Sequence, residues 1–119
     1  MGVPSWITTT FADARRASIV VIAGTLDLVD PEGRDALVEA AVHYQRAARE
    51  EEPGCEAYCF AADPVVPGRI QVYELWEDHA SIAAHFKHPY YEQMKQILGS
   101  CGITGSWNQM YEVARHEPV

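Results

Sequence analysis

Hydrophobic and polar positions along the chain follow two periods. Four segments carry the short runs of β-branched, aromatic and alternating residues that are typical of strands. The predicted strands are residues 18–28, 55–62, 69–76 and about 106–115. Between them, apolar residues recur at helical spacing after the helix-starting signals Asp30-Pro31, Asp78 and Pro89. The pattern therefore predicts four strands, one long helix and a second helix broken in two.

The order of these elements is β-α-β-β-α-β, the split βαβ arrangement of ferredoxin-like folds. It predicts an α+β domain with an antiparallel sheet and with the helices on one face of that sheet. The domain is expected at residues 18–115, after a polar N-terminal arm at 1–17 and before a C-terminal tail at 116–119. The arm is either ordered or a loose tail, and Trp6 and Phe11 indicate that part of it packs.

The first predicted strand has apolar side chains on both of its faces. One face carries Val20, Ile22, Leu26 and Leu28, and the other carries Ile19, Val21 and Ala23. Because the helices can cover only one face of the sheet, the other face must pack against a second protein surface. Another copy of the chain is the simplest source of such a surface. The pattern therefore predicts a homodimer formed through the open sheet face.

The charge balance is acidic, with 17 Asp and Glu against 9 Lys and Arg and a formal net charge of -8 at pH 7. Nucleic acid and anionic membranes both require clustered cations, so neither is expected as a partner. No stretch approaches the roughly 20 apolar residues of a membrane span. Arg15-Arg16 stands before an apolar run as in a twin-arginine signal, but that run ends at Asp27 without a small-residue cleavage site. A first strand and a cytoplasmic location are therefore expected.

The cysteines and histidines give little indication of a disulfide or a metal. Cys55 and Cys59 would lie roughly 13 Å apart along a strand, too far for a bridge or a shared metal, and Cys101 falls in a predicted loop. His85 and His88 are close in sequence but lack a third ligand. No dinucleotide-binding, phosphate-loop, zinc-protease or nucleophile-elbow motif occurs in the chain. Reduced cysteines, and neither metal nor cofactor, are expected.

Aromatic side chains gather on the two middle strands and on the helices predicted to cover them. The candidate ligand-binding residues are Tyr58, Phe60, Tyr73, Trp76, Phe86, Tyr90 and Met94. Aromatic walls with a few polar tips suit a flat organic ligand, although the same residues also serve to fill a small core. Asn108 and Gln109 alternate across the last strand, so one of them is expected on the ligand side.

Two ionisable residues lie among these aromatics. His85 shares a helical face with Ile82 and Phe86, and an imidazole is the side chain best suited to accept a proton near neutral pH. Glu74 lies mid-strand among apolar neighbours, where a carboxylate is costly unless paired. Each has a structural alternative: His85 as a core histidine bound to a carbonyl, and Glu74 as an ion-pair partner of Arg69 or Arg34.

These residues fall in short motifs through which the chain resembles the antibiotic biosynthesis monooxygenase (ABM) family, which includes small quinol monooxygenases. The motifs are Glu52-Pro53-Gly54-Cys55 followed by Tyr58, then Tyr73-Glu74-Leu75-Trp76, Ala84-His85-Phe86 and the helix-opening Asp30-Pro31-Glu32. The likeness extends over about residues 18–113. It implies a ferredoxin-like fold in a dimeric α/β-barrel assembly, in which two sheets pack face to face.

The resemblance also implies an activity, that of a cofactor-free monooxygenase oxidising a small aromatic, phenolic or quinol-type substrate with molecular oxygen. The family pattern places Trp76 and His85 at the pocket and, by extension, Tyr58 and Glu74. His85 would take a proton from a phenol of pKa about 10, and the resulting anion can pass an electron directly to oxygen. Haem-degrading relatives use an Asn-Trp-His set, and no clear asparagine occurs at the matching early-strand position here.

Two other functions stay open on the sequence alone, because a fold does not fix a function. One is an isomerase or lyase that uses His85 as a proton shuttle. The other is a non-catalytic dimeric module that binds a small molecule. Only the monooxygenase consumes oxygen, and only the two enzymes depend on His85 for turnover.

Overall fold

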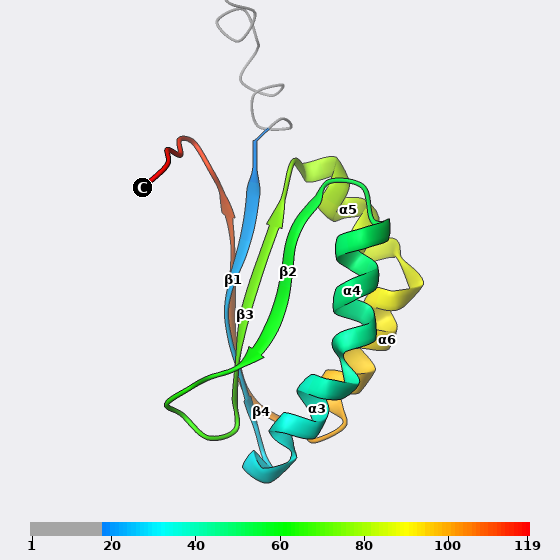
Figure 1. Cartoon of the computed structure of the whole chain (residues 1–119), viewed down its shortest axis with the longest axis vertical. Coiled ribbons are helices and arrows are strands. Elements are labelled where there is room, and N and C mark those ends of the chain that lie inside the picture. Colours follow the sequence, from blue (N-terminus) through cyan, green and yellow to red (C-terminus); the bar gives the residue numbers. More distant parts are fainter. Residues whose placement is uncertain (1–17) are drawn as a thin grey trace, which may run out of the picture.

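The computed structural model describes residues 18–119, which form a four-stranded antiparallel sheet with helices on one face (Figure 1). The strands are β1 (Val20–Leu28), β2 (Cys55–Ala62), β3 (Arg69–Trp76) and β4 (Ile103–Glu112). Their order in the sheet is β2-β3-β1-β4, which confirms the predicted ferredoxin-like α+β fold. The predicted arm at 1–17, with Trp6, Phe11 and Arg15-Arg16, lies outside the described residues.

The helices begin where the local sequence predicts. They are a short 3-10 turn (Pro31–Gly33), α3 (Arg34–Ala40), α4 (Val42–Glu51), α5 (His79–Lys87) and α6 (Pro89–Gly99). The Asp30 side chain accepts a hydrogen bond from the Glu32 backbone N–H, and Asp78 caps α5 in the same way through Ser81. The first helix differs from the prediction in detail: it opens as a 3-10 turn and is interrupted at Ala41.

The last strand is displaced from the predicted residues 106–115 and runs from Ile103 to Glu112. Its limits follow from pairing with β1, because Ile103 lies opposite Leu28 and Glu112 lies opposite Val20. The strand starts directly after Gly102, whose φ of 72° reverses the chain. β1 likewise starts at Val20, two residues later than predicted.

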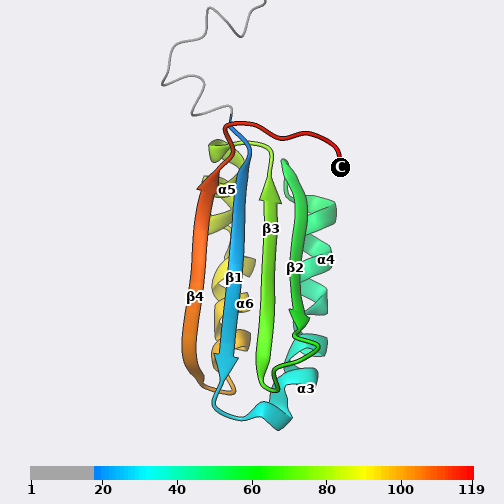
Figure 2. The ribbon, with the colours of Figure 1, turned by 90° about the vertical axis from the view of Figure 1, so that its left-hand side faces the viewer.

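The two faces of the sheet have different surroundings. On the covered face, Val20, Ile70 and Trp76 are fully buried in the core beneath the helices. α3 and α4 pack against β2, and α5 packs against β3. The other face lies open toward the viewer in Figure 2, with the helices behind it. Its side chains include the exposed Tyr73 and Trp107.

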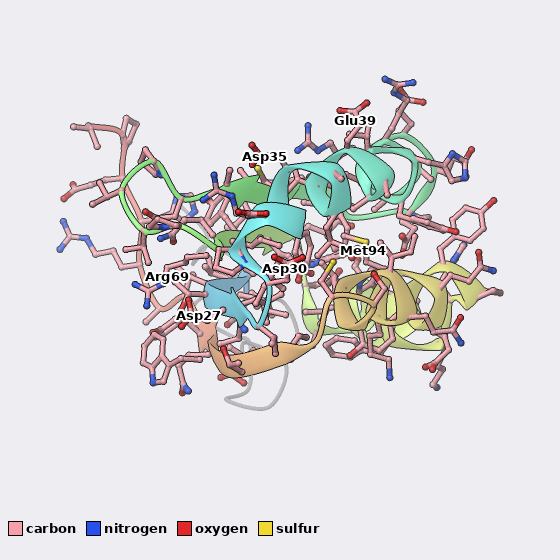
Figure 3. All side chains as sticks on the ribbon, turned by 90° about the horizontal axis from the view of Figure 1, so that it is seen from below. Asp27, Asp30, Asp35, Glu39, Arg69 and Met94 are labelled. Carbon is pink, nitrogen blue, oxygen red and sulfur yellow. The ribbon has the colours of Figure 1, made fainter. Side chains whose placement is uncertain are left out.

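Polar contacts secure the lower end of the sheet. The Arg69 guanidinium donates to the Asp27 carboxylate at 2.8 and 3.2 Å, and the two side chains lie together there in Figure 3. In the same view Met94 points from α6 into the interior, where it is buried. Cys55, Cys59 and Cys101 are free thiols. Within residues 18–119, no helix combines the length and apolar character that crossing a membrane requires.

Candidate functional site

A pocket of about 450 Å³ opens between the helices and the β1–β4 half of the sheet. It is lined by Ile22, Leu26, Phe60, Val72, Glu74, Phe86, Tyr91, Lys95, Leu98, Ile103, Ser106, Asn108, Gln109 and Met110. Most of these side chains are apolar, and only Glu74 and Lys95 are ionisable groups that carry charge near neutral pH. A pocket of this size, with apolar walls and few polar groups, suits a small organic molecule.

Glu74 reaches this pocket from the covered face of β3 and is only 6% exposed. Its Oε1 accepts a hydrogen bond of 3.0 Å from the indole N–H of Trp76. Burial raises the pKa of Glu74 to about 7, against the lowering effect of the Trp76 bond and with a smaller raising effect of the Glu52 charge. At neutral pH the carboxyl group therefore exists in both protonation states, as a general base requires.

The ion-pair alternatives predicted for Glu74 are wrong. Arg69 pairs with Asp27, as described above. Arg34 binds the neighbouring Asp35 and donates to the backbone carbonyls of Asp63 and Val66. Neither arginine is therefore the partner of the Glu74 carboxyl.

His85 lies directly behind Glu74 and is 3% exposed. Its Nδ1 is 2.8 Å from Oε1 of Glu52, and its Nε2 is 3.9 Å from Oε1 of Glu74. Burial lowers the pKa of His85, while the hydrogen bond and the charge of Glu52 act in the opposite direction. The ring packs at 4.6 Å from the Trp76 ring and 5.2 Å from the Tyr58 ring, measured between centroids. The imidazole is thus held between two buried carboxyl groups, and its partner is a carboxylate rather than the backbone carbonyl of the structural alternative.

Glu52 is a site residue that the sequence reasoning did not identify as one. It caps the C-terminal end of α4 and begins the turn Glu52-Pro53-Gly54. Gly54 has φ 81°, and a Cβ atom there would lie 2.0 Å from Oγ of Ser81 in the first turn of α5. This close approach holds the turn against α5, one helical turn before His85. The sequence signal was a third consecutive acidic residue at a helix C-terminus, where the helix dipole disfavours it.

The predicted ligand-binding residues occupy five different places. Phe60 and Phe86 line the pocket. Tyr58 and Trp76 are buried behind it and contact His85, and burial raises the pKa of Tyr58. Met94 is buried in the core, where it fills space.

Tyr73 and Tyr90 lie away from the pocket. Tyr73 is 46% exposed on the open sheet face, because successive side chains of a strand point to opposite faces. Tyr90 packs against the rings of Tyr44 and His43 of α4. Tyr91, its neighbour in sequence, lines the pocket instead.

Three further residues named in the sequence analysis have clear positions. Asn108 lies opposite Gly24, on the covered face of the sheet, and its side-chain amide donates to the Thr25 carbonyl at 3.3 Å. Both Asn108 and Gln109 border the pocket. His88 caps α6 by accepting a hydrogen bond from the Tyr90 backbone N–H. Among residues 18–119, no three His, Cys, Asp or Glu side chains are grouped so that they could hold a metal ion.

Replacing Glu74 with glutamine is expected to stabilise the protein at pH 8 but not at pH 4. Between pH 4.5 and about 7 the unfolded carboxyl is ionised while the folded one keeps its proton, so the stability of the unsubstituted protein falls as pH rises. A shift of this size corresponds to about 3 kcal/mol. Urea unfolding at both pH values measures the difference, with the exposed Glu56→Gln as control. A stability difference that does not change with pH would contradict the raised pKa.

Comparisons with known proteins show the family and the fold. The family model "Antibiotic biosynthesis monooxygenase" matches residues 19–96. A solved structure from Deinococcus radiodurans, whose name assigns it provisionally to these monooxygenases, is 26% identical, with a TM-score of 0.73 over 84% of this chain and 97% of that one. A similarly named Caulobacter crescentus structure shares the fold at 15% identity, with a TM-score of 0.75 over 85% of this chain and 94% of that one.

A sequence relative of uncharacterised function extends beyond this chain. The Synechocystis protein sll1783 is 27% identical over 74 residues, which are 62% of this chain. The chain spans about half the length of that relative, 49%. The family match, in contrast, covers β1 through most of α6 and includes Glu52, Glu74 and His85. The chain therefore belongs to the antibiotic biosynthesis monooxygenase family.

Proposed function

We propose that the protein is a cofactor-free monooxygenase that oxidises a small phenolic or quinol-type compound with molecular oxygen. The observation that carries the proposal is the Glu74 carboxyl group at the wall of an apolar pocket, with a pKa of about 7 and a buried imidazole behind it. Perturbed ionisable groups in a pocket are typical of catalytic sites. The family match and the name of the Deinococcus radiodurans structure support the same reaction class.

The shape and polarity of the pocket favour a flat aromatic substrate. Phe60, Phe86 and Tyr91 offer ring faces and edges against which such a substrate can pack. A hydroxyl group of the substrate would meet the Glu74 carboxylate, the acidic residue on the pocket wall. Lys95 borders the pocket as its cationic residue and holds its ammonium group 4.9 Å from the centre of the Tyr91 ring.

The first step is removal of a proton from the substrate. A phenol has a pKa of about 10, so a carboxylate of pKa about 7 accepts its proton far more readily than an ordinary carboxylate does. The proton moves from the substrate oxygen to Glu74 and onward to Nε2 of His85 when their 3.9 Å separation closes. The substrate is then an electron-rich anion inside an apolar pocket.

The second step uses oxygen as the only oxidant. The anion gives one electron to O2, which produces a substrate radical and superoxide. These two radicals combine and form a carbon–oxygen bond. Loss of water from the resulting hydroperoxide leaves a carbonyl group. For a phenol with a free para carbon, the balance is phenol plus O2 to quinone plus water. One oxygen atom enters the substrate and the other leaves as water, so no further reductant is needed.

Oxygen uptake by the purified protein tests this function. A panel of phenols and hydroquinones is expected to give uptake above the background autoxidation rate, with quinone as product. Glu74→Gln is expected to lower the protein-dependent rate by about 100-fold, within the range for loss of a general base. The exposed Glu56→Gln is the control. Substrate conversion without oxygen uptake, or binding without conversion, would overturn the proposal in favour of an isomerase or a binding module.

We further propose that the protein is a homodimer formed through the open sheet face. That face exposes Tyr73, Trp107 and Tyr111, with Trp107 61% exposed. Large aromatic side chains are typical anchors of protein interfaces. The register places all three on the face opposite the helices, because they pair with Ala23, Thr25 and Val21 of β1.

Replacing Trp107 with glutamate is expected to weaken this dimer by about 2 kcal/mol or more, roughly 30-fold in Kd, because it leaves an unpaired charge in the interface. Light scattering across a dilution series measures the change in mass from two chains to one. Val65→Glu is the matched control, because Val65 is equally apolar and highly exposed but lies in the β2–β3 loop. A monomeric unsubstituted protein, or unchanged dimerisation of the Trp107 variant, would contradict this arrangement.

A further inference from the structure

We propose that Glu52 is the positioning residue of the site: its carboxylate accepts the Nδ1 proton of His85 and so leaves Nε2 as a free acceptor that faces Glu74. The inference rests on the proposed function only for the role of Nε2 as the proton acceptor during the reaction. The geometry itself is independent of the reaction, since it consists of one hydrogen bond and one turn of the backbone.

The contacts of His85 define which ring nitrogen carries the proton. Nδ1 is 2.8 Å from Oε1 of Glu52, a distance typical of a hydrogen bond to a charged acceptor. The side chains of His85 and Glu52 are only 3% and 9% exposed, so water does not compete freely for this bond. A carboxylate accepts and cannot donate, so the imidazole must place its proton on Nδ1. Nε2 is then unprotonated and points toward Glu74 at 3.9 Å.

The backbone keeps Glu52 in this place. The backbone N–H of Cys55 donates to the Glu52 carbonyl at 3.2 Å, and that of Glu77 donates to the Gly54 carbonyl at 2.8 Å. The turn is therefore tied to the end of β3 as well as to α5. An acidic side chain in this turn has a fixed direction toward His85, unlike one on the solvent-facing side of α4.

Other ionisable groups surround the imidazole and bear on its titration. Tyr58 on β2 and Tyr91 on α6 pack against the ring at 5.2 and 5.3 Å between centroids. The charge of His88, at the C-terminal cap of α5, acts to lower the pKa of His85. Burial raises the pKa of the Cys55 thiol to about 11, so that it stays neutral near pH 7. Glu52 and Glu74 are thus the carboxyl groups beside the ring.

In the proposed reaction the arrangement acts as a proton relay. The proton that leaves the substrate oxygen binds Glu74 and then Nε2 of His85, which becomes an imidazolium with protons on both nitrogens. The Glu52 carboxylate stabilises that cation through the Nδ1 bond, as a carboxylate does for the histidine of a hydrolase triad. When the substrate has been oxidised, the proton returns through Glu74 to the departing oxygen species and leaves as part of water.

Nitrogen-15 NMR of the histidine side chains tests the positioning role without any substrate. The spectrum of the full chain is compared with those of Glu52→Gln and Glu52→Ala, and loss of one signal in His85→Asn assigns His85. In the unsubstituted protein, His85 is expected to show a protonated Nδ1 and an unprotonated Nε2. Glu52→Gln keeps an acceptor oxygen but loses the charge, so it should keep this tautomer and lower the pKa of His85. Glu52→Ala should lose the Nδ1–H preference as well.

The matched control is Glu51→Gln, the same change one residue earlier on an exposed side chain. It should alter neither the tautomer nor the pKa of His85. A tautomer and a pKa that stay unchanged in both Glu52 variants would overturn the inference. Should Glu52→Ala fail to fold, the pKa in Glu52→Gln decides alone, because the glutamine side chain preserves the shape of the site.

Turnover separates this inference from the proposed function. If oxygen uptake is present, Glu52→Gln is expected to lower kcat by about 10-fold or more with KM nearly unchanged, because Glu52 does not touch the substrate. If oxygen uptake is absent but the NMR result holds, the proposed function fails while Glu52 keeps its positioning role. If uptake is present and kcat is unaffected by Glu52→Gln, the relay is overturned.

Discussion

Replacing His85 with asparagine is expected to lower oxygen-dependent turnover by about 100-fold or more while the protein remains folded. The asparagine amide can still donate to Glu52, as Nδ1 does at 2.8 Å, but it has no nitrogen that accepts a proton near neutral pH. Losing the acceptor behind Glu74 removes the onward route for the substrate proton, within the range of effects known for general acid–base groups. Initial rates of oxygen uptake, with folding followed by circular dichroism, measure the effect.

His43→Asn is the matched control for this substitution, because His43 lies exposed on α4. It should keep full activity. His85→Ala forms a second arm: it also removes the acceptor, but it leaves a cavity in the core and is expected to cost stability as well. Activity of His85→Asn equal to that of the unsubstituted protein would show that Glu74 acts without His85.

The pH profile distinguishes a relay from a merely structural histidine. Glu74 accepts a proton only when ionised, so kcat/KM of the unsubstituted protein is expected to rise as pH increases through about 7. If His85 has only a structural role, His85→Asn should lower kcat/KM by the same factor at every pH. A relay role predicts that the His85→Asn profile rises again at higher pH, where hydroxide or water replaces the imidazole as proton acceptor.

The fold was largely predictable because its signals are local. The bounds of β2 and β3 match the prediction residue for residue, since Gly54 and the loop before Arg69 interrupt both patterns. The caps at Asp78 and Pro89 fixed the starts of α5 and α6 in the same way. The last strand was predicted three residues too late. Its limits are set by pairing with β1, which is distant in sequence, and no local turn signal within residues 106–115 indicates where that pairing begins or ends.

The site was predictable only in part, for a different physical reason. His85 and Glu74 could be identified because an ionisable side chain at a buried position is costly unless it is paired. The structure brings the two side chains to within 3.9 Å of each other. Glu52 could not be identified, because a run of acidic residues at a helix end is normally exposed to solvent. Only the structure shows that the turn after Glu52 folds against α5. Tyr73 and Tyr90 show the opposite error, since aromatic type alone does not reveal which face of an element borders a cavity.

Trp76→Ala is expected to have the largest effect on stability, about 3–5 kcal/mol of the free energy of unfolding. Trp76 is fully buried and packs against both the His85 and the Tyr58 rings, so its removal leaves a large cavity in the centre of the core. A domain of this size has only about 5–15 kcal/mol in total. Urea unfolding measures the loss, with Val65→Ala as the control, because Val65 is apolar and exposed and lies in the β2–β3 loop, away from both the core and the proposed interface.

Trp76→Phe separates the packing role of the tryptophan from its hydrogen bond. Phenylalanine retains much of the buried ring but has no N–H to donate to Oε1 of Glu74. Because that bond lowers the pKa of Glu74, its loss should raise the pKa above about 7. The rise of kcat/KM with pH should then shift to higher pH, whereas a purely structural tryptophan would lower the rate equally at every pH. An unshifted profile in a folded Trp76→Phe protein would mean that the indole N–H does not tune the base, and that burial and the Glu52 charge set its pKa.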